Sequence, residues 1–289
     1  MNILVIGGTR YFGIPMVTRL IEDGNRVTIA SRGLTPDPFG NDVDRIKLDL
    51  EDEDSVRSGL KDKGYDVVID KMGYCSNEMK WILESVKCDR FIHMSTAGVY
   101  TLDHKNIRED EFDPIKGELI WCGRRELSYD DVKRNAERAL FQVYTKIDCV
   151  AVRVPFVLGE NDYTRRLLFY VEHIIDGKPM YISNPDECFC VAHCDEISDM
   201  LVDLCGSDFT GTINGCSDGL VSVRQILDYV SLRTGCVPVL TDDGDVAPYN
   251  GTKTNSLNTD RAYNMGIRFS NVDSWIYDLL DHYLMNKFS

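Results

Sequence analysis

Long hydrophobic runs and an excess of basic charge are both missing from this sequence of 289 residues. No apolar run approaches the roughly 18 residues that a membrane-spanning helix needs, so no membrane partner is expected. Lys and Arg number 32 against 47 Asp and Glu, which gives a formal net charge of −15. Because proteins that bind nucleic acid usually carry a basic face, no nucleic-acid partner is expected either. A local basic pocket for one phosphorylated small molecule remains compatible with this charge.

The sequence also lacks a basic leader segment, since its first seven residues hold only a short apolar stretch before glycine. No secretory signal peptide is predicted, and the ten cysteines are expected to be reduced thiols in a cytoplasmic protein. One cluster, Cys188, Cys190, His193 and Cys194, brings possible metal ligands close together in sequence. Its spacing matches no common zinc pattern, so a cysteine-rich buried strand is preferred and no metal site is predicted.

Short apolar runs alternate with amphipathic stretches over the first 155 residues. Strands are expected at residues 3–6, 27–30, 45–50, 67–69, 90–94 and 148–154, and helices at 11–22, 55–60, 79–86 and 129–144. Strands that alternate with helices imply a parallel sheet with right-handed crossovers. The sequence therefore predicts an α/β fold, with a Rossmann-type, doubly wound parallel sheet over residues 1–155.

The alternation loosens after residue 155. Further helices are expected at residues 163–175, 195–204, 222–233 and 271–284, with short β-like runs and Gly, Asn and Asp turns between them. This pattern predicts a smaller C-terminal α/β substrate cap over residues 156–289, with residues 191–215 returning to the main sheet. Such a cap would lie at the carboxyl edge of the sheet, where these folds bind ligands.

The most specific motif is the turn Gly7-Gly8-Thr9-Arg10-Tyr11-Phe12-Gly13 between the first strand and the first helix. Glycine at the strand exit permits a tight turn and a close approach of the backbone to a pyrophosphate. The helix that follows offers free N–H groups and a positive dipole end. Because the motif stands between a strand and a helix, it predicts a dinucleotide site that uses all seven residues.

The second strand is expected to end near the adenosine ribose, at Ala30-Ser31-Arg32-Gly33. This segment lacks the carboxylate that commonly takes the ribose 2′-hydroxyl of NAD. Arg32 suits a 2′-phosphate instead, and Arg10 adds a second positive charge. The sequence therefore favours NADP(H), with NAD(H) as the alternative. Asp49, followed by Leu50, is a candidate for binding the adenine amino group.

Polar side chains suited to proton transfer follow the fifth strand and open the next long helix. Ser95 and Thr96 end the strand, and Tyr129 and Lys133 share one face of the helix because they are four residues apart. A tyrosine is a useful proton donor or acceptor only if its pKa, near 10 when unperturbed, is lowered. A neighbouring lysine ammonium lowers it by favouring the phenolate.

In their order along the chain, the glycine turn, the Ser95-Thr96 pair and Tyr129-x-x-x-Lys133 resemble the short-chain dehydrogenase/reductase superfamily. The closer resemblance is to its extended and atypical members, the NAD-dependent epimerase/dehydratase family. It runs through nearly the whole chain, because residues 95–100, 153–159 and 193–197 also look like segments of that family.

The resemblance implies an NAD(P)-dependent oxidoreductase, whether reductase, epimerase or dehydratase. Its reaction would be reversible hydride transfer at a carbonyl or carbinol carbon of a small-molecule substrate. Tyr129 would be the general acid/base, and Lys133 would bind the nicotinamide ribose and lower the pKa of Tyr129. Thr96, with Ser95, would hydrogen-bond the substrate oxygen.

The same resemblance implies further contacts. Met72 and Gly73 would lie along the cofactor, and the backbone of Pro155 and Phe156 would face the nicotinamide carboxamide. In the cap, Arg165 and Arg166 are weaker candidates for an anionic group of the substrate, against the alternative of surface cations.

A second interpretation is a non-catalytic NAD(P)-binding sensor or an RNA-binding member of the same fold. Some relatives with a similar Gly-Gly-Thr-Arg turn work in that way. The complete set of Thr96, Tyr129 and Lys133 favours an enzyme, and the acidic balance disfavours RNA. A homodimer that packs through the Tyr129 helix is the assembly common in the resembled family.

Overall fold

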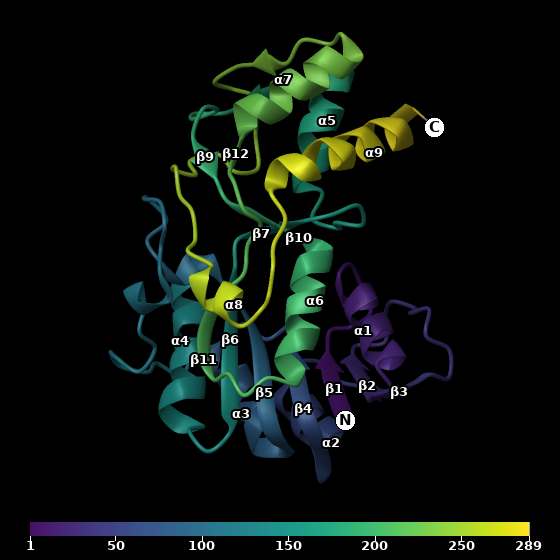
Figure 1. The fold of residues 1–289 in the computed structure, drawn as a ribbon, viewed down its shortest axis with the longest axis vertical. Coiled ribbons are helices and arrows are strands. Elements are labelled where there is room, and N and C mark those ends of the chain that lie inside the picture. The colour runs from purple at the N-terminus through teal and green to yellow at the C-terminus, as the bar shows by residue number, and fades with distance from the viewer. Residues whose placement is uncertain (289) are drawn as a thin grey trace.

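The computed structural model describes residues 1–288 and shows a seven-stranded parallel sheet with a smaller cap above its carboxyl edge (Figure 1). The strand order is β11-β6-β5-β4-β1-β2-β3, and every neighbouring pair is parallel. The strands are β1 (Asn2–Ile6), β2 (Arg26–Ser31), β3 (Val43–Lys47), β4 (Lys63–Asp70), β5 (Val86–Thr96), β6 (Asp148–Val154) and β11 (Gly211–Asn214). The predicted Rossmann-type sheet is therefore confirmed.

Helices cover both faces of this sheet, which is why its central strands are continuous apolar runs. The covering helices are α1 (Gly13–Glu22), α2 (Glu53–Leu60), α3 (Ser76–Ser85), α4 (Tyr129–Val143) and α6 (Cys194–Cys205). Side chains alternate across a strand, so Ile3 and Val5 pack with α1 and α6, whereas Leu4 and Ile6 pack with α2, α3 and α4.

The cap has its own hydrophobic core, formed mainly by three helices and their short strands. Its helices are α5 (Arg166–Asp176), α7 (Val223–Thr234) and α9 (Ile276–Phe288), with α8 (Asp260–Asn264) nearer the sheet (Figure 1). The short strands are β7 (Phe156–Leu158), β8 (Pro179–Tyr181), β9 (Cys188–Phe189), β10 (Val191–His193), β12 (Val221–Ser222), β13 (Val239–Leu240) and β14 (Asp245–Val246). Three 3₁₀ turns complete the elements: η1 (Ala97–Val99), η2 (Glu109–Glu111) and η3 (Val272–Ser274).

The predicted elements are present, but several ends differ. The first helix begins at Gly13 rather than residue 11, because Tyr11 has a positive φ of 54° that a helix does not allow. The expected helix at residues 271–284 is divided into η3 and α9. β11 lies beside β6 at the edge of the main sheet, while the division of the chain at residue 155 stays a prediction. None of the helices in residues 1–288 is long and apolar enough to cross a membrane.

The segment between η2 and α4 lies along the outer side of α3 and α4. Gln142 donates to the carbonyl of Pro114 (2.8 Å), and Ser76 donates to the carbonyl of Ile120 (2.8 Å). The backbone N–H of Ile120 in turn donates to Asn135 of α4 (2.8 Å). A homodimer through α4, which remains a prediction, would have to form over this segment.

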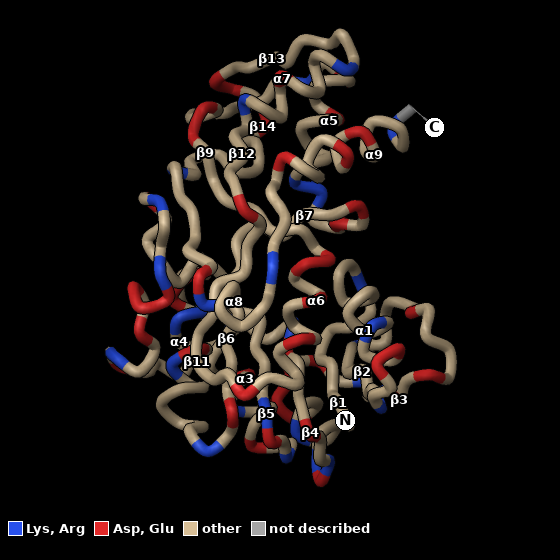
Figure 2. The backbone as a smooth tube through the Cα atoms, viewed as in Figure 1, with Lys and Arg blue, Asp and Glu red and all other residues tan. Residues whose placement is uncertain are grey.

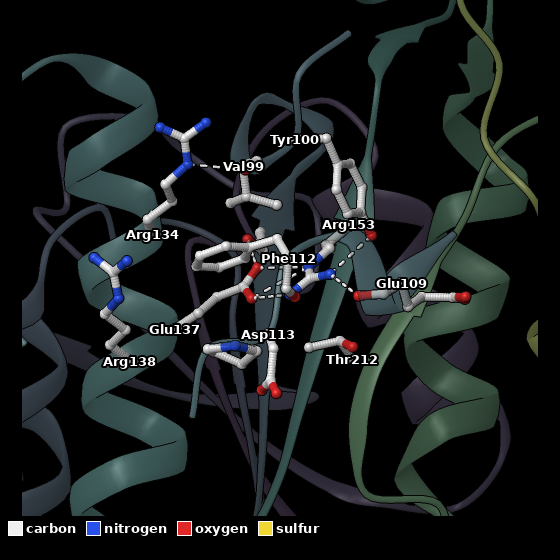
Figure 3. Close-up of polar contacts among 12 residues, drawn as sticks. Val99, Tyr100, Glu109, Phe112, Asp113, Arg134, Glu137, Arg138, Arg153 and Thr212 are labelled. Atoms are coloured by element: carbon white, nitrogen blue, oxygen red, sulfur yellow. Dashed lines mark hydrogen bonds and ion pairs between the residues drawn. The ribbon is translucent and has the colours of Figure 1, made fainter. Parts of the chain in front are cut away.

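A buried ion pair connects β6 to α4 beneath the cleft (Figure 3). The guanidinium of Arg153 is fully buried and donates to the carboxylate of Glu137 at 2.5 and 3.0 Å. It also donates to the hydroxyl of Tyr100 (2.8 Å) and to the carbonyls of Glu109 (2.8 Å) and Phe112 (2.9 Å). Burial alone would lower the pKa of Arg153, but Glu137 more than offsets it and the pKa is raised.

The same network reaches two further strands. Ser95 of β5 donates to the second oxygen of Glu137 (2.5 Å), and Tyr100 donates to the side chain of Asn214 on β11 (2.7 Å). Because the charges are removed from water, their stability depends on each partner being present. The network therefore holds α4, β5, β6 and β11 in one arrangement.

Replacing Glu137 by Gln should lower the free energy of unfolding by about 3–5 kcal/mol, because Arg153 would keep a buried charge without its counter-ion. Chemical denaturation measures the loss. The matched control is Arg57→Gln, which removes two exposed ion pairs, one with Glu53 of α2 and one with Glu84 of α3, and should cost about 1 kcal/mol or less. Equal losses in the two variants would contradict this account of the network.

Candidate active site

The glycine turn is tight enough that side chains are excluded at its ends. Gly7 has a φ of +94°, and a Cβ there would lie 2.1 Å from Cγ of Met72. A Cβ on Gly13 would lie 2.9 Å from the carbonyl oxygen of Gly7 and 3.0 Å from that of Gly8. The backbone at Gly7 and Gly13 is therefore not covered by a side chain, and α1 begins close to the end of β1. Both features fit a site for a dinucleotide diphosphate.

A cavity of about 290 Å³ lies beside this turn, over the carboxyl ends of β1, β2 and β4. Seven of the predicted cofactor ligands line it: Gly7, Thr9, Arg10, Arg32, Asp49, Leu50 and Met72. The guanidinium of Arg10 donates to the hydroxyl of Thr35 (2.7 Å), which holds that side chain at the cavity wall. We call this space the adenosine-side cavity.

A larger cavity of about 830 Å³ lies between the carboxyl edge of the sheet and the cap. We call it the cap cavity, and Tyr163 lines both cavities. The predicted site residues that line it are Tyr11, Phe12, Ser95, Thr96, Tyr129, Pro155, Phe156 and Arg166. Gly8, Gly13, Gly73, Lys133 and Arg165 line neither cavity.

Tyr129 opens α4 at the wall of the cap cavity. The helix begins there because Ser128 caps it by accepting the backbone N–H of Asp131 (3.2 Å). Tyr129 is 49% exposed, and the side chain of Thr96 lies close enough to lower its pKa. Its ring packs edge to face against Tyr74, with the ring centroids 5.8 Å apart.

The predicted lowering of the Tyr129 pKa by Lys133 is not what the structure shows. Partial burial is the largest influence and raises the pKa of Tyr129, while the hydrogen bond with Thr96 acts in the opposite direction. The nearby Arg166 also lowers it, whereas Tyr74 and Asp130 raise it. Lys133 is not among the five largest influences, and its ammonium donates to the backbone carbonyls of Gly73 and Met94.

Lys133 is buried directly behind the ring of Tyr74. Its ammonium donates to the carbonyls of Gly73 (2.8 Å) and Met94 (3.1 Å) and lies 4.9 Å from the centroid of Tyr74. Burial lowers the pKa of Lys133 to about 8, and the carboxylate of Asp70 acts in the opposite direction. Tyr74 thus contacts both members of the Tyr129-x-x-x-Lys133 motif.

Gly73 is held in place by a buried acid at the end of β4. Asp70 accepts the backbone N–H groups of Gly73 (2.7 Å) and Met72 (3.1 Å), and its other oxygen lies 2.9 Å from Nδ1 of His93. Ser95 is not brought to Tyr129, because its hydroxyl is bonded to Glu137 in the buried network.

Arg165 and Arg166, the two arginines predicted in the cap, lie in different surroundings. Arg166 lies 5.6 Å above the ring of Phe156 and lines the cap cavity, as do Asn250 and Lys253. Arg165 has a φ of 57° and forms an ion pair with Glu172 at 2.5 Å, away from the cavity.

The cysteine cluster has local structural partners. His193 caps α6 by accepting the backbone N–H of Asp195 (3.3 Å), so a helix begins in the segment 193–197 that resembles the family. The side-chain donor atoms of His193, Cys194 and Asp195 lie within 4.8 Å of one another. Cys190 instead contacts the side chain of Asn255 (3.4 Å). Three consecutive residues at a helix N-terminus do not resemble a closed metal site.

Sequence reasoning gave no individual role to Lys71, Tyr74 or Arg124, although each of them lines one of these cavities. Lys71 and Tyr74 follow β4, so their position after a strand of the parallel sheet was an available signal. Arg124 belongs to the long segment before Tyr129, and it reaches Glu78 and the ring of Tyr74 only through tertiary folding.

Substituting Gly13 by Ala should lower the free energy of unfolding by about 1–3 kcal/mol, because the new methyl group would clash with the backbone of Gly7 and Gly8. The control is Gly64→Ala on β4, where a Cβ meets nothing within 4 Å. Chemical denaturation should place the control within about 0.5 kcal/mol of wild type. A similar loss in both variants would argue against the close approach at the turn.

Residues 3–81 match the model of the NAD dependent epimerase/dehydratase family. A curated relative, the chloroplast stem-loop binding protein of 41 kDa b from Arabidopsis thaliana, is 34% identical over 129 residues. That match covers 39% of this chain and 34% of the relative, so the chain matches about a third of the relative's length.

Solved structures resemble the chain over its whole length. UDP-glucose 4-epimerase from Thermotoga maritima, solved with UDP-glucose, has a TM-score of 0.76 at 17% identity and full coverage of both chains. UDP-glucuronic acid 4-epimerase from Bacillus cereus, solved with NAD, has a TM-score of 0.73 at 18% identity, covering 98% of this chain and 96% of that one. These findings agree with the resemblance: residues 3–81 match the model of the NAD dependent epimerase/dehydratase family, and the chain has the fold of the solved epimerases.

Proposed function

We propose that this protein is an NAD(P)-dependent oxidoreductase or epimerase that acts by reversible hydride transfer at a carbonyl or carbinol carbon. The observation that carries this proposal is that Thr96 and Tyr129 come together in the wall of the cap cavity, at the carboxyl edge of the sheet. The adenosine-side cavity adjoins it at Tyr163, so the two together offer space for a dinucleotide and a second small molecule.

The chain's own residues would hold the cofactor. The bare glycine turn suits the diphosphate, while Arg32, helped by Arg10, suits a ribose 2′-phosphate and favours NADP(H) over NAD(H). Asp49 would accept the adenine amino group. When bound, a nicotinamide cofactor supplies or accepts the hydride.

Replacing Arg32 by Ala should weaken NADPH binding by about 10–100-fold, because a charged hydrogen bond to the 2′-phosphate is lost. NADH affinity should change by less than about twofold, since NADH has no such phosphate. Isothermal titration calorimetry measures both. Arg26→Ala is the matched control, because Arg26 begins the strand β2 that leads to Arg32 and pairs with Asp44 outside the cavity. Unchanged NADPH affinity in the Arg32 variant would exclude this role.

Proton transfer would fall to Tyr129. Its hydroxyl can donate or accept a proton toward a substrate oxygen in the cap cavity, and the hydroxyl of Thr96 would orient it. Lys133 would keep a positive charge behind Tyr74 and offer its remaining N–H to a ribose hydroxyl.

On the cap side, Arg166 and Lys253 would attract an anionic substrate group. The solved neighbour from Thermotoga maritima carries UDP-glucose, and the ring of Phe156 lies beside Arg166 in the cap cavity. The substrate class therefore needs a screen of both carbonyl compounds and sugar nucleotides.

Removing the Tyr129 hydroxyl with Tyr129→Phe should reduce turnover by at least about 100-fold, while cofactor affinity stays within about twofold of wild type. Turnover is followed by cofactor absorbance with the substrates that the wild type accepts. Tyr163→Phe is the control, because it removes a hydroxyl from the same cavity without touching Thr96. Full activity of the Tyr129 variant would overturn the assignment.

A second candidate function is binding without turnover, either as a cofactor sensor or on a nucleic-acid stem-loop. The name of the Arabidopsis relative favours it. Against stem-loop binding, Figure 2 shows acidic and basic positions interspersed along the backbone of both the sheet and the cap, rather than basic positions alone gathered in one segment. Cofactor binding by wild type and by the Tyr129 variant, with no turnover in either across the full panel, would favour the sensor.

A further inference from the structure

Lys71 lies at the point where the glycine turn and β4 face each other across the adenosine-side cavity. It directly follows β4, and its backbone N–H still donates to Ile6 at the end of β1 (3.1 Å). Its ammonium donates to the carbonyl of Arg10 (3.1 Å) and lies 4.0 Å from the centroid of the Phe12 ring. The side chain thus reaches from β4 onto the middle of the turn.

We propose that Lys71 is a second phosphate-binding element of this site, which reaches the diphosphate of the dinucleotide from the end of β4, beside the glycine turn. This inference rests on the proposed function, because it needs a dinucleotide in the cleft. Lys71 would thus be a residue that binds the diphosphate although it does not belong to the glycine motif.

The surroundings of the ammonium lack a compensating anion. Among the described residues, its contacts are a neutral carbonyl and an aromatic ring, and the only titratable side chain that influences it is the thiol of Cys194. Burial lowers the pKa of Lys71 to about 8. A partly desolvated ammonium without a carboxylate is costly, and an anionic ligand would remove that cost.

The position also concentrates positive potential. The N-terminal end of α1 begins at Gly13 below the turn, and Arg10 lines the same cavity from the turn itself. An ammonium has three N–H donors, and Arg10 accepts only one of them. Lys71 can therefore hold the turn in place and still donate to a phosphate oxygen.

Lys71 and Arg32 would bind different groups of the cofactor. The diphosphate is common to NADH and NADPH, whereas only NADPH carries the 2′-phosphate. Loss of Lys71 should weaken both cofactors by the same factor, while loss of Arg32 should weaken NADPH alone.

The test is calorimetric titration of the full chain with NADPH, NADH and adenosine 2′-monophosphate, which lacks a diphosphate. Lys71→Met should bind NADPH and NADH about tenfold more weakly than wild type. It should bind adenosine 2′-monophosphate as wild type does, which shows that the cavity is still folded. Lys71→Arg should keep most of the affinity. Lys63→Met removes the same charge from the exposed, opposite end of β4 and should change nothing.

Wild-type affinity of Lys71→Met for both cofactors would overturn the assignment of Lys71 and leave the proposed function standing. Weakening of NADPH alone would also overturn it, because Lys71 would then act on the 2′-phosphate. If the wild type binds neither cofactor, the proposed function fails and the inference falls with it.

Discussion

The buried pair of Arg153 and Glu137 is the constraint on which the candidate site depends. Glu137 lies about two turns along α4 from Tyr129, so the pair sets where that helix sits against β5 and β6. Ser95 of β5 donates to the same carboxylate and so fixes the end of β5 against α4. The next residue, Thr96, therefore lies beside the phenol of Tyr129. A buried charge that loses one of its partners destabilises the protein strongly, so α4 cannot shift against β5 and β6 without a large loss of stability. The polar core thus positions the face of α4 that carries Tyr129.

The net charge of −15 describes the whole chain but not the cleft. Arg10, Arg32, Lys71 and Arg124 line one small cavity together with the acids Asp49 and Glu51. A basic interior in an acidic protein favours a phosphorylated small molecule, since the surrounding negative potential discourages polyanions. The positive charge of the protein that would contact a phosphate is therefore concentrated at this cavity.

Much of the fold follows from local patterns, and the glycine turn, Thr96 and Tyr129 could be located from the sequence. What the sequence could not supply is the direction of side chains across the cleft. Tyr129 and Lys133 share a helix face, yet the ring of Tyr74, which follows β4, contacts both of them. The ammonium of Lys133 donates to backbone carbonyls instead of approaching Tyr129. The sequence likewise predicts that Ser95 contacts the substrate. In the structure, its hydroxyl donates a hydrogen bond to Glu137 instead.

The sequence by itself determined the alternating strands and helices, the bare turn at Gly7 and Gly13, and the family resemblance. Hydrophobic period and glycine requirement are properties of neighbouring residues, so they can be read along the chain. Only the tertiary structure decided that Lys71 faces the glycine turn, that Arg165 and Arg166 separate, and that burial raises the pKa of Tyr129. These outcomes depend on contacts between residues far apart in the chain and on removal from water, which no local pattern encodes.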